Sequence, residues 1–215
     1  MGPERSFARW FKANGHGFIQ YEDTTSVPDL VGSAHGIVLD LGAGIGNQIQ
    51  RFDKAKVQHI FGVEPNTSFA AVLTDRIKEL GWEGKYTPVF CAVEDATELK
   101  KHGIVPGSVD CVVCMQVLCS VDKPAAVARE LYSLLKPGGE LLFWEHHRST
   151  DRLTRIFQWL WSSVWSLSLA GCRLDRPVKD AFLRAGDWEL VQIDEDKDGA
   201  LIMPRVWGKL VKRSV

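Results

Sequence analysis

The sequence has no long hydrophobic run and almost no excess of charge. No segment of its 215 residues offers the ~20 consecutive apolar residues that a membrane-spanning helix needs, and its start does not resemble a signal peptide. Its 26 basic and 27 acidic residues give a net charge of −1, so no strongly basic surface is available for a nucleic-acid backbone. We therefore expect a cytoplasmic protein with no nucleic-acid partner. Contact with a membrane surface is left open but is not expected, and no pattern indicates an oligomeric state.

Cysteine is scarce, and its positions lack the pattern of a disulfide framework. The five cysteines are an odd number, and most lie in or beside predicted strands. Cys111 and Cys114 have C-x-x-C spacing, but they lie in a predicted strand, where residues three apart point to opposite faces. We therefore expect reduced core thiols and no metal site. The cysteines are Cys91, Cys111, Cys114, Cys119 and Cys172.

The chain also lacks a proline-, glycine- or serine-rich linker, which favours a single domain over residues 1–215. From residue 36 onward, apolar runs alternate with amphipathic stretches, the pattern of a mostly parallel sheet covered on both faces. The predicted strands are 36–41, 59–64, 87–93, 109–115, 139–145, 188–194 and 205–212. The predicted helices lie near 46–54, 67–80, 124–136, 151–170 and 177–185.

The last two predicted strands follow one another without a helix between them. Such strands form an antiparallel pair, here at one edge of the sheet. The expected fold is therefore a three-layer α/β/α sandwich with a seven-stranded, mostly parallel sheet and an antiparallel last strand. A plain dinucleotide-binding fold does not normally end in this way.

A glycine-rich loop follows the first predicted strand in the segment VLDLGAGIGN. Gly42, Gly44 and Gly46 occupy alternate positions, and the missing Cβ atoms let a polar ligand approach the backbone. The NAD fingerprint G-x-G-x-x-G requires glycine at 47, where this chain has Asn47. The G-x-G-x-G form points to S-adenosylmethionine, with Ala43 and Asn47 also predicted at the ligand.

Acidic residues after the first three strands complete the predicted cofactor site. Glu64 ends the second strand, where its carboxylate can accept hydrogen bonds from both ribose hydroxyls, or it is an ordinary strand-end acid. Asp40 is assigned to the amino group at the methionine end, with loop capping as the alternative. Glu94 and Asp95 are assigned to the adenine edge. Further predicted cofactor residues are Pro65, Asn66, Met115 and Gln116, with core packing as the alternative for Met115.

Five segments, in order, resemble the class I, type 11 S-adenosylmethionine-dependent methyltransferases: VLDLGAGIGN, GVEPN, VEDAT, GSVDCVVCMQVLCSV and LKPGGELLFWEH. More narrowly, VVCMQVLCSV, FWEHH and the downstream SLSLAGCRLDR resemble the methyltransferase-like 7 family, whose members resemble small-molecule thiol methyltransferases. The resemblance spans residues 36–210 and implies S-adenosyl-L-methionine as cofactor and S-adenosyl-L-homocysteine as product. The chain departs from that family at its N-terminal segment, where a membrane anchor is usual, and in the loop sequence G-A-G-I-G.

The candidate catalytic residues follow the fifth predicted strand at the edge where open α/β sheets bind ligands. His146 and His147 are candidate bases, with solvated loop histidines as the alternative, and Glu145 is a candidate for orienting a histidine or the acceptor. Methyl transfer from a sulfonium requires alignment and no metal. Sulfur is the favoured acceptor atom, ahead of oxygen or nitrogen, because a thiol is already partly ionised at neutral pH.

Aromatic residues gather in two segments flanking the predicted core. Residues 151–175 form a predicted helical cap whose apolar residues are too numerous for one buried stripe, and residues 1–35 form a predicted lid, with plain packing as the alternative. We assign Cys119, Trp161 and Trp165 to substrate binding. These residues predict a lipophilic small-molecule acceptor. The alternatives are a cyclase or pericyclase of natural-product biosynthesis that binds the cofactor without methyl transfer, and a cofactor-binding partner subunit.

Overall fold

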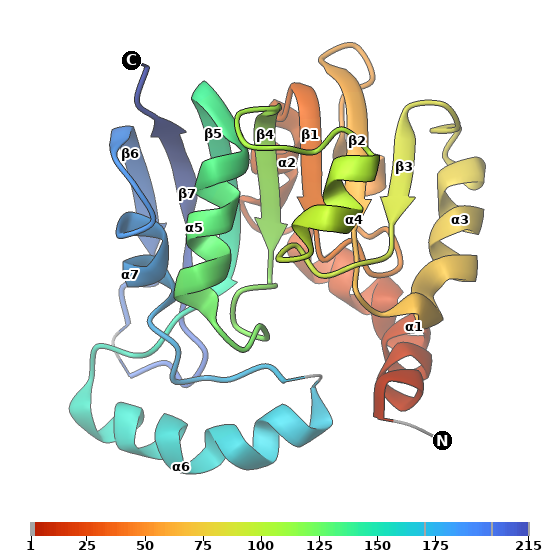
Figure 1. The fold of residues 1–215 in the computed structure, drawn as a ribbon. Helices are drawn as coiled ribbons and strands as arrows, with labels where there is room; N and C mark the ends of the chain where they lie inside the picture. The colour runs from red at the N-terminus through yellow and green to blue at the C-terminus, as the bar shows by residue number, and fades with distance from the viewer. Residues whose placement is uncertain (1–2, 170, 199, 215) are drawn as a thin grey trace.

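A seven-stranded sheet forms the centre of the protein, whose computed structural model describes residues 3–169, 171–198 and 200–214. The strand order is β3-β2-β1-β4-β5-β7-β6 (Figure 1). Strand β7 runs against its neighbours β5 and β6, which confirms the predicted antiparallel pair at one edge. The strands are β1 (Gly36–Leu41), β2 (Val57–Val63), β3 (Tyr86–Val89), β4 (Val109–Met115), β5 (Leu135–His146), β6 (Trp188–Glu195) and β7 (Arg205–Lys212).

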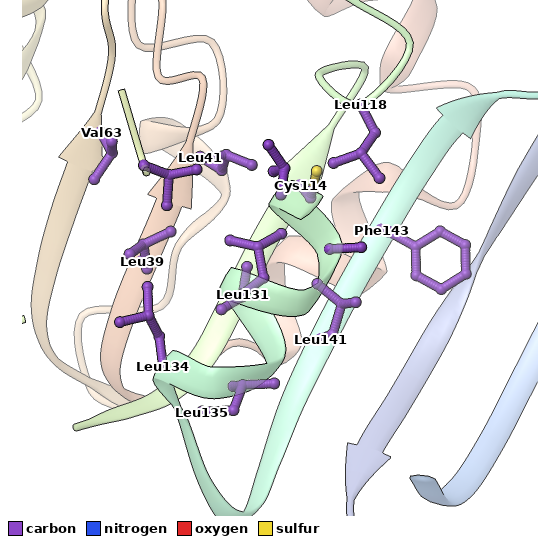
Figure 2. Packing of buried hydrophobic residues seen from close by; sticks show 14 of the residues in the cluster. Leu39, Leu41, Val63, Cys114, Leu118, Leu131, Leu134, Leu135, Leu141 and Phe143 are labelled. Atoms are coloured by element: carbon purple, nitrogen blue, oxygen red, sulfur yellow. The ribbon is translucent and has the colours of Figure 1, made fainter. Parts of the chain in front are cut away.

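Helices cover both faces of the sheet, as the three-layer prediction required. Along β4, Val112 packs into one core cluster and Val113 into the other, because successive strand residues point to opposite faces. Figure 2 shows Leu131 and Leu134 of α5 directed at the first face. That face is covered by α4 (Ala96–Lys101), α5 (Pro124–Leu134) and α7 (Val178–Leu183), and the other by α2 (Val27–Ser33) and α3 (Ala70–Glu79).

The five cysteines are buried free thiols, as predicted. Cys114 lies in the core cluster shared with α5, whereas Cys111 lies in the cluster shared with α3. The two thiols of this C-x-x-C pair are thus separated by the sheet itself, and the prediction that they point to opposite faces is confirmed.

Two longer helices lie at the edge where the parallel strands end (Figure 1). These are α1 (Pro3–Glu22), in the segment predicted as a lid, and α6 (Arg152–Ser168), in the segment predicted as a cap. The Asp151 side chain begins α6 by accepting the N–H of Thr154 at 2.7 Å. Met1, Gly2 and Ala170 of the predicted lid and cap lie outside the described residues. Among the described helices, none combines the length and apolarity that crossing a membrane requires.

The predicted helix near 46–54 is wrong. The chain forms turns there and only a short 3₁₀ helix, η1 (Ile49–Arg51). Gly46 adopts a φ of +81°, which ends any helical path at the start of that segment. Elsewhere the third strand stops at Val89 instead of 93, and β5 begins at Leu135 because the helix before Pro137 ends at Leu134. The other predicted elements agree to within a few residues.

Candidate functional site

The glycine loop and Glu64 are joined directly at the carboxyl ends of β1 and β2. The Glu64 carboxylate accepts the N–H of Gly44 at 3.0 Å and the N–H of Asn66 at 2.8 Å. Glu64 is 7% exposed, and burial raises its pKa although both backbone donors favour the ionised form. At Gly42, whose φ is +65°, a Cβ would lie 2.6 Å from the Val117 side chain, so the loop requires glycine.

Asp40 lies inside the sheet's second core, not at the loop surface. Its carboxylate accepts a hydrogen bond from the Tyr86 hydroxyl at 2.8 Å. Burial raises the pKa of Asp40 to about 7, and the hydrogen bond from Tyr86 opposes this rise. Burial likewise raises the pKa of Tyr86 well above its usual value. The observed partner of Asp40 is therefore Tyr86, a residue that no motif in the sequence linked to it.

Helix α1 packs directly on the glycine loop. A Cβ at Gly44 would lie 3.6 Å from the Phe11 ring, and a Cβ at Gly15 of the helix would overlap the Ile45 side chain. Phe11 also stacks on Phe18, with ring centroids 5.2 Å apart. The N-terminal segment thus covers the loop, which is the position that a lid over the cofactor site would take.

A buried ionic network fixes the end of α1. The Glu22 carboxylate accepts hydrogen bonds from three side chains: the Arg51 guanidinium at 2.6 Å, the Gln48 amide at 3.0 Å and the Gln116 amide at 3.1 Å. Glu22 and Arg51 are both almost fully buried side chains. This network joins α1, the turn after the glycine loop and the end of β4. The sequence reasoning missed Glu22, Gln48 and Arg51, because they match no local motif.

The Trp144 ring, on β5, contacts residues from near both ends of the chain. The Arg205 guanidinium lies 4.6 Å from the ring centroid, in a cation–π contact. The Tyr21 ring packs edge-on at 6.1 Å. Trp144 thereby connects α1 and β7 to the centre of the sheet.

The remaining predicted cofactor residues divide into buried and exposed groups. Ala43 and Asn47 are buried beside the loop, and Asn47 Oδ1 has no hydrogen-bond partner among the described residues. Pro65 and Glu94 are exposed. The side chains of two others cap helices: Asn66 accepts the N–H of Ser68 at 3.0 Å, and Asp95 accepts the N–H of Glu98 at 3.0 Å.

Glu145, a predicted catalytic residue, holds the loop that follows β4. Its fully buried carboxylate accepts the N–H groups of Val117 at 2.6 Å and Leu118 at 2.9 Å, with that of Cys119 at 3.4 Å. Burial raises its pKa to about 7, against the effect of these donors. The loop bends at Gln116, whose φ is +62°. These bonds make Glu145 a positioning residue in this structure, while Met115 is buried in the core.

His146 lies in a buried group with two thiols. Its Nδ1 is 3.4 Å from Cys172 Sγ, which is 3.6 Å from Cys119 Sγ. When Cys172 ionises, the Cys119 thiol can donate to its sulfur, which lowers the pKa of Cys172 and raises that of Cys119. The indole N–H of Trp165 also lowers the pKa of Cys172, although it makes no hydrogen bond of ordinary geometry among the described residues. The structure therefore brings together the predicted residues Cys119, His146 and Trp165.

His147 and Trp161 lie apart from this group. His147 Nδ1 accepts the backbone N–H of Lys179 at 3.4 Å, and burial lowers its pKa. Trp161 is 45% exposed and stacks on Phe157, with ring centroids 6.0 Å apart. His146 is the last residue of β5 and His147 follows it, and successive side chains of an extended chain point to opposite sides, so the two rings lie apart.

The loop region fits an S-adenosylmethionine molecule in its donors and acceptors. Glycines line the loop that follows β1, and the Glu64 carboxylate follows β2. The Asn47 amide oxygen is buried without a hydrogen-bond partner among the described residues. Such groups suit the hydroxyl and ammonium donors of that cofactor.

Known proteins share both the sequence and the fold. The family described as "Methyltransferase domain" matches residues 39–143. Thiol S-methyltransferase TMT1A of Homo sapiens is 30% identical over 178 residues, covering 81% of this chain and 70% of the relative. Thiol S-methyltransferase TMT1B of Rattus norvegicus is 31% identical over 194 residues, covering 87% and 76%.

Solved structures agree on the fold. The [4+2]-cyclase SpnF has a TM-score of 0.67 at 16% identity, covering 92% of this chain and 81% of its own. Phosphoethanolamine N-methyltransferase 2 of Haemonchus contortus, solved with S-adenosyl-L-methionine, has a TM-score of 0.63 at 15% identity, covering 88% and 52%. The strand order with its inserted antiparallel β7, the glycine loop and the identity over most of both chains lead to one conclusion: this chain belongs to the thiol S-methyltransferase family of class I S-adenosylmethionine-dependent methyltransferases.

Proposed function

We propose that the protein transfers a methyl group from S-adenosylmethionine to the sulfur of a lipophilic small-molecule thiol. The observation that carries the proposal is the identity of 30–31% to thiol S-methyltransferases over 81–87% of this chain. The cofactor supplies an electrophilic methyl group on a sulfonium, and the chain supplies binding and alignment, worth up to ~7–11 kcal/mol of the barrier.

Cofactor binding is assigned to the glycine loop and the residues around it. Glu64 is already held at its carboxylate by Gly44 and Asn66, which leaves its remaining lone pairs for ribose hydroxyls. The unpartnered Asn47 Oδ1 offers a second acceptor within the described part of the chain. Helix α1, packed on Gly44 through Phe11, excludes water from this side.

The ionisable groups at the sheet edge support sulfur as the acceptor atom. Glu145 is fully committed to backbone N–H groups, so it is poorly placed to remove a proton from an alcohol. A thiol with a pKa of ~8.5 needs little help from a base, because a few per cent of it is already thiolate at neutral pH. His146, beside Cys119 and Cys172, is the candidate base at this edge.

Helix α6 supports a lipophilic acceptor. Its inward face carries the fully buried Gln158 and Ser162, and most of its apolar residues, Trp165 excepted, face outward. Exposed apolar patches of this kind are typical of ligand or interaction sites. A cleft of about 470 Å³ beside the helix is lined by Ile156 and Trp159 together with arginines. The exposed apolar residues are Leu153, Ile156, Phe157, Trp159, Leu160, Trp161, Val164 and Leu167.

The test is incubation with methyl-labelled cofactor and a panel of thiols, phenols and amines matched in size and apolarity. We expect label in lipophilic thiols and a product heavier by one methyl group. Preference for phenols, amines or hydrophilic thiols would contradict the proposal. A product of unchanged mass would instead indicate the cyclisation that the sequence left open.

A further inference from the structure

Three side chains with metal-binding atoms meet at one buried point. Cys119 lies in the loop after β4, His146 ends β5, and Cys172 follows α6. Their ligand atoms all lie within 4.8 Å of one another, and all three side chains are buried. They are far apart in the sequence, since 53 positions separate the two cysteines and 26 separate His146 from Cys172.

The spacing of these atoms matches tetrahedral coordination. With Zn–S bonds of ~2.3 Å and Zn–N bonds of ~2.0 Å, tetrahedral angles place two sulfurs ~3.8 Å apart and a sulfur and a nitrogen ~3.5 Å apart. The structure has 3.6 Å between Cys119 Sγ and Cys172 Sγ, and 3.4 Å between Cys172 Sγ and His146 Nδ1. Two of the three separations between ligand atoms therefore need shifts of only about 0.1–0.2 Å.

Ordinary core packing explains this group poorly. The His146 imidazole is buried, yet its Nδ1 meets only a thiol, and its Nε2 has no hydrogen-bond partner among the described residues. The Trp165 indole nitrogen, near enough to Cys172 to lower its pKa, is also buried without a hydrogen-bond partner in that part of the chain. Buried polar groups in native proteins are normally satisfied, and a thiolate bound to a cation accepts N–H groups of this kind.

We propose that Cys119, His146 and Cys172 form a binding site for one thiophilic divalent cation, with Zn²⁺ as the type. Two thiolates and an imidazole are the donor set that selects such an ion over Mg²⁺ or Ca²⁺. Binding releases the two thiol protons. Three protein ligands leave the fourth coordination position to water or a substrate thiol. With Nδ1 on the ion and the proton on Nε2, His146 cannot act as a base, so its base role belongs to the metal-free protein. This proposal revises the expectation that the chain holds no metal site.

The test uses the full chain without a histidine tag, reduced, stripped with a chelator and titrated with Zn²⁺ against a chromophoric competitor. We expect one ion per chain. Cys119→Ser, His146→Gln and Cys172→Ser should each weaken binding at least about 100-fold, since losing even an outer-shell partner costs ~10–100-fold. Cys91→Ser, which removes a buried thiol outside the group, should bind like the wild type.

Cobalt provides a second readout that does not depend on turnover. Co²⁺ bound to the wild type should show thiolate charge-transfer absorption, reduced in both cysteine variants and kept in Cys91→Ser. Each variant must still bind S-adenosylhomocysteine, which shows that it is folded. Binding of less than one ion per chain, or the same affinity in all variants, would overturn the proposal. A reduced protein that takes up no metal, and that forms a Cys119–Cys172 disulfide on oxidation, would overturn it as well. Because metal uptake is measured without an acceptor, it stands or falls separately from thiol methylation.

Discussion

The Glu64 carboxylate and the Gly44 N–H, which come from adjacent strand ends, are joined by a hydrogen bond of 3.0 Å. The bond ties the acidic side chain that follows β2 to the middle of the glycine loop. Glu64 therefore both fixes the shape of the glycine loop and supplies the predicted hydrogen-bond acceptor for the ligand.

Glu64→Ala should weaken S-adenosylmethionine binding by about 1.5–3 kcal/mol, the range for hydrogen bonds to a charged group. Calorimetry with the cofactor and its demethylated product measures this, with NAD as a ligand expected not to bind. Glu83→Ala, at an exposed position away from the loop, is the matched control. An unchanged dissociation constant would remove Glu64 from the site.

Asp40→Asn should change how stability depends on pH. The pKa of Asp40 is about 7 in the folded protein, against the ordinary aspartate value of 3.8 that applies once the chain unfolds. Between these values the folded state holds a proton that the unfolded state has lost, so this group's contribution is full below pH ~4 and declines as pH rises to ~7. Asparagine keeps an acceptor for Tyr86 and does not ionise.

Urea unfolding of both proteins from pH ~5 to ~7 measures the effect. The stability of Asp40→Asn relative to the wild type should rise by on the order of 2 kcal/mol over this range, because one pKa unit corresponds to ~1.4 kcal/mol. Glu83→Gln should give a curve parallel to that of the wild type. Parallel curves for Asp40→Asn as well would show that Asp40 ionises normally.

The two adjacent histidines should respond differently to substitution. In the metal-free protein, His146→Gln should lower kcat by roughly 10²–10⁴-fold, the contribution of a working base, while cofactor affinity is retained. His147→Gln should keep turnover within about twofold, because its ring contacts the backbone of α7 instead of the thiol group. Turnover kinetics of the two variants with one acceptor decide this, and equal effects, or none, would contradict the assignment.

Trp165→Ala should raise KM for the acceptor or abolish turnover, with little change in cofactor affinity, because its indole lies against Cys172. Trp161→Ala removes an indole of the same size from the outer face of the same helix and is the matched comparison. The kinetics of each variant should be compared with its melting temperature. If Trp165→Ala only lowers Tm, then Trp165 is a packing residue and the acceptor binds elsewhere.

Sequence patterns predicted the elements that depend on residues close together in the chain. The β1 strand, the glycine loop and Glu64 follow one another within a short span, so alternation and spacing revealed them. The Cys119–His146–Cys172 group was not predictable, because its members come from three elements that only the folded sheet edge brings together. Glu22 was missed for the same reason, and the helix near 46–54 failed because its apolar residues serve a turn fixed by Gly46.

The contacts of the Trp144 indole constrain the order in which parts of the protein can fold. Tyr21 reaches it from α1, and Arg205 reaches it from the start of β7. During synthesis the ribosome delivers α1 long before β7, so a nascent chain that already has this helix lacks the Arg205 contact that completes this corner. Long-range contacts of this kind form late because loop closure costs entropy before they stabilise the fold. Assembly of the sheet edge around Trp144 must therefore await translation of β7.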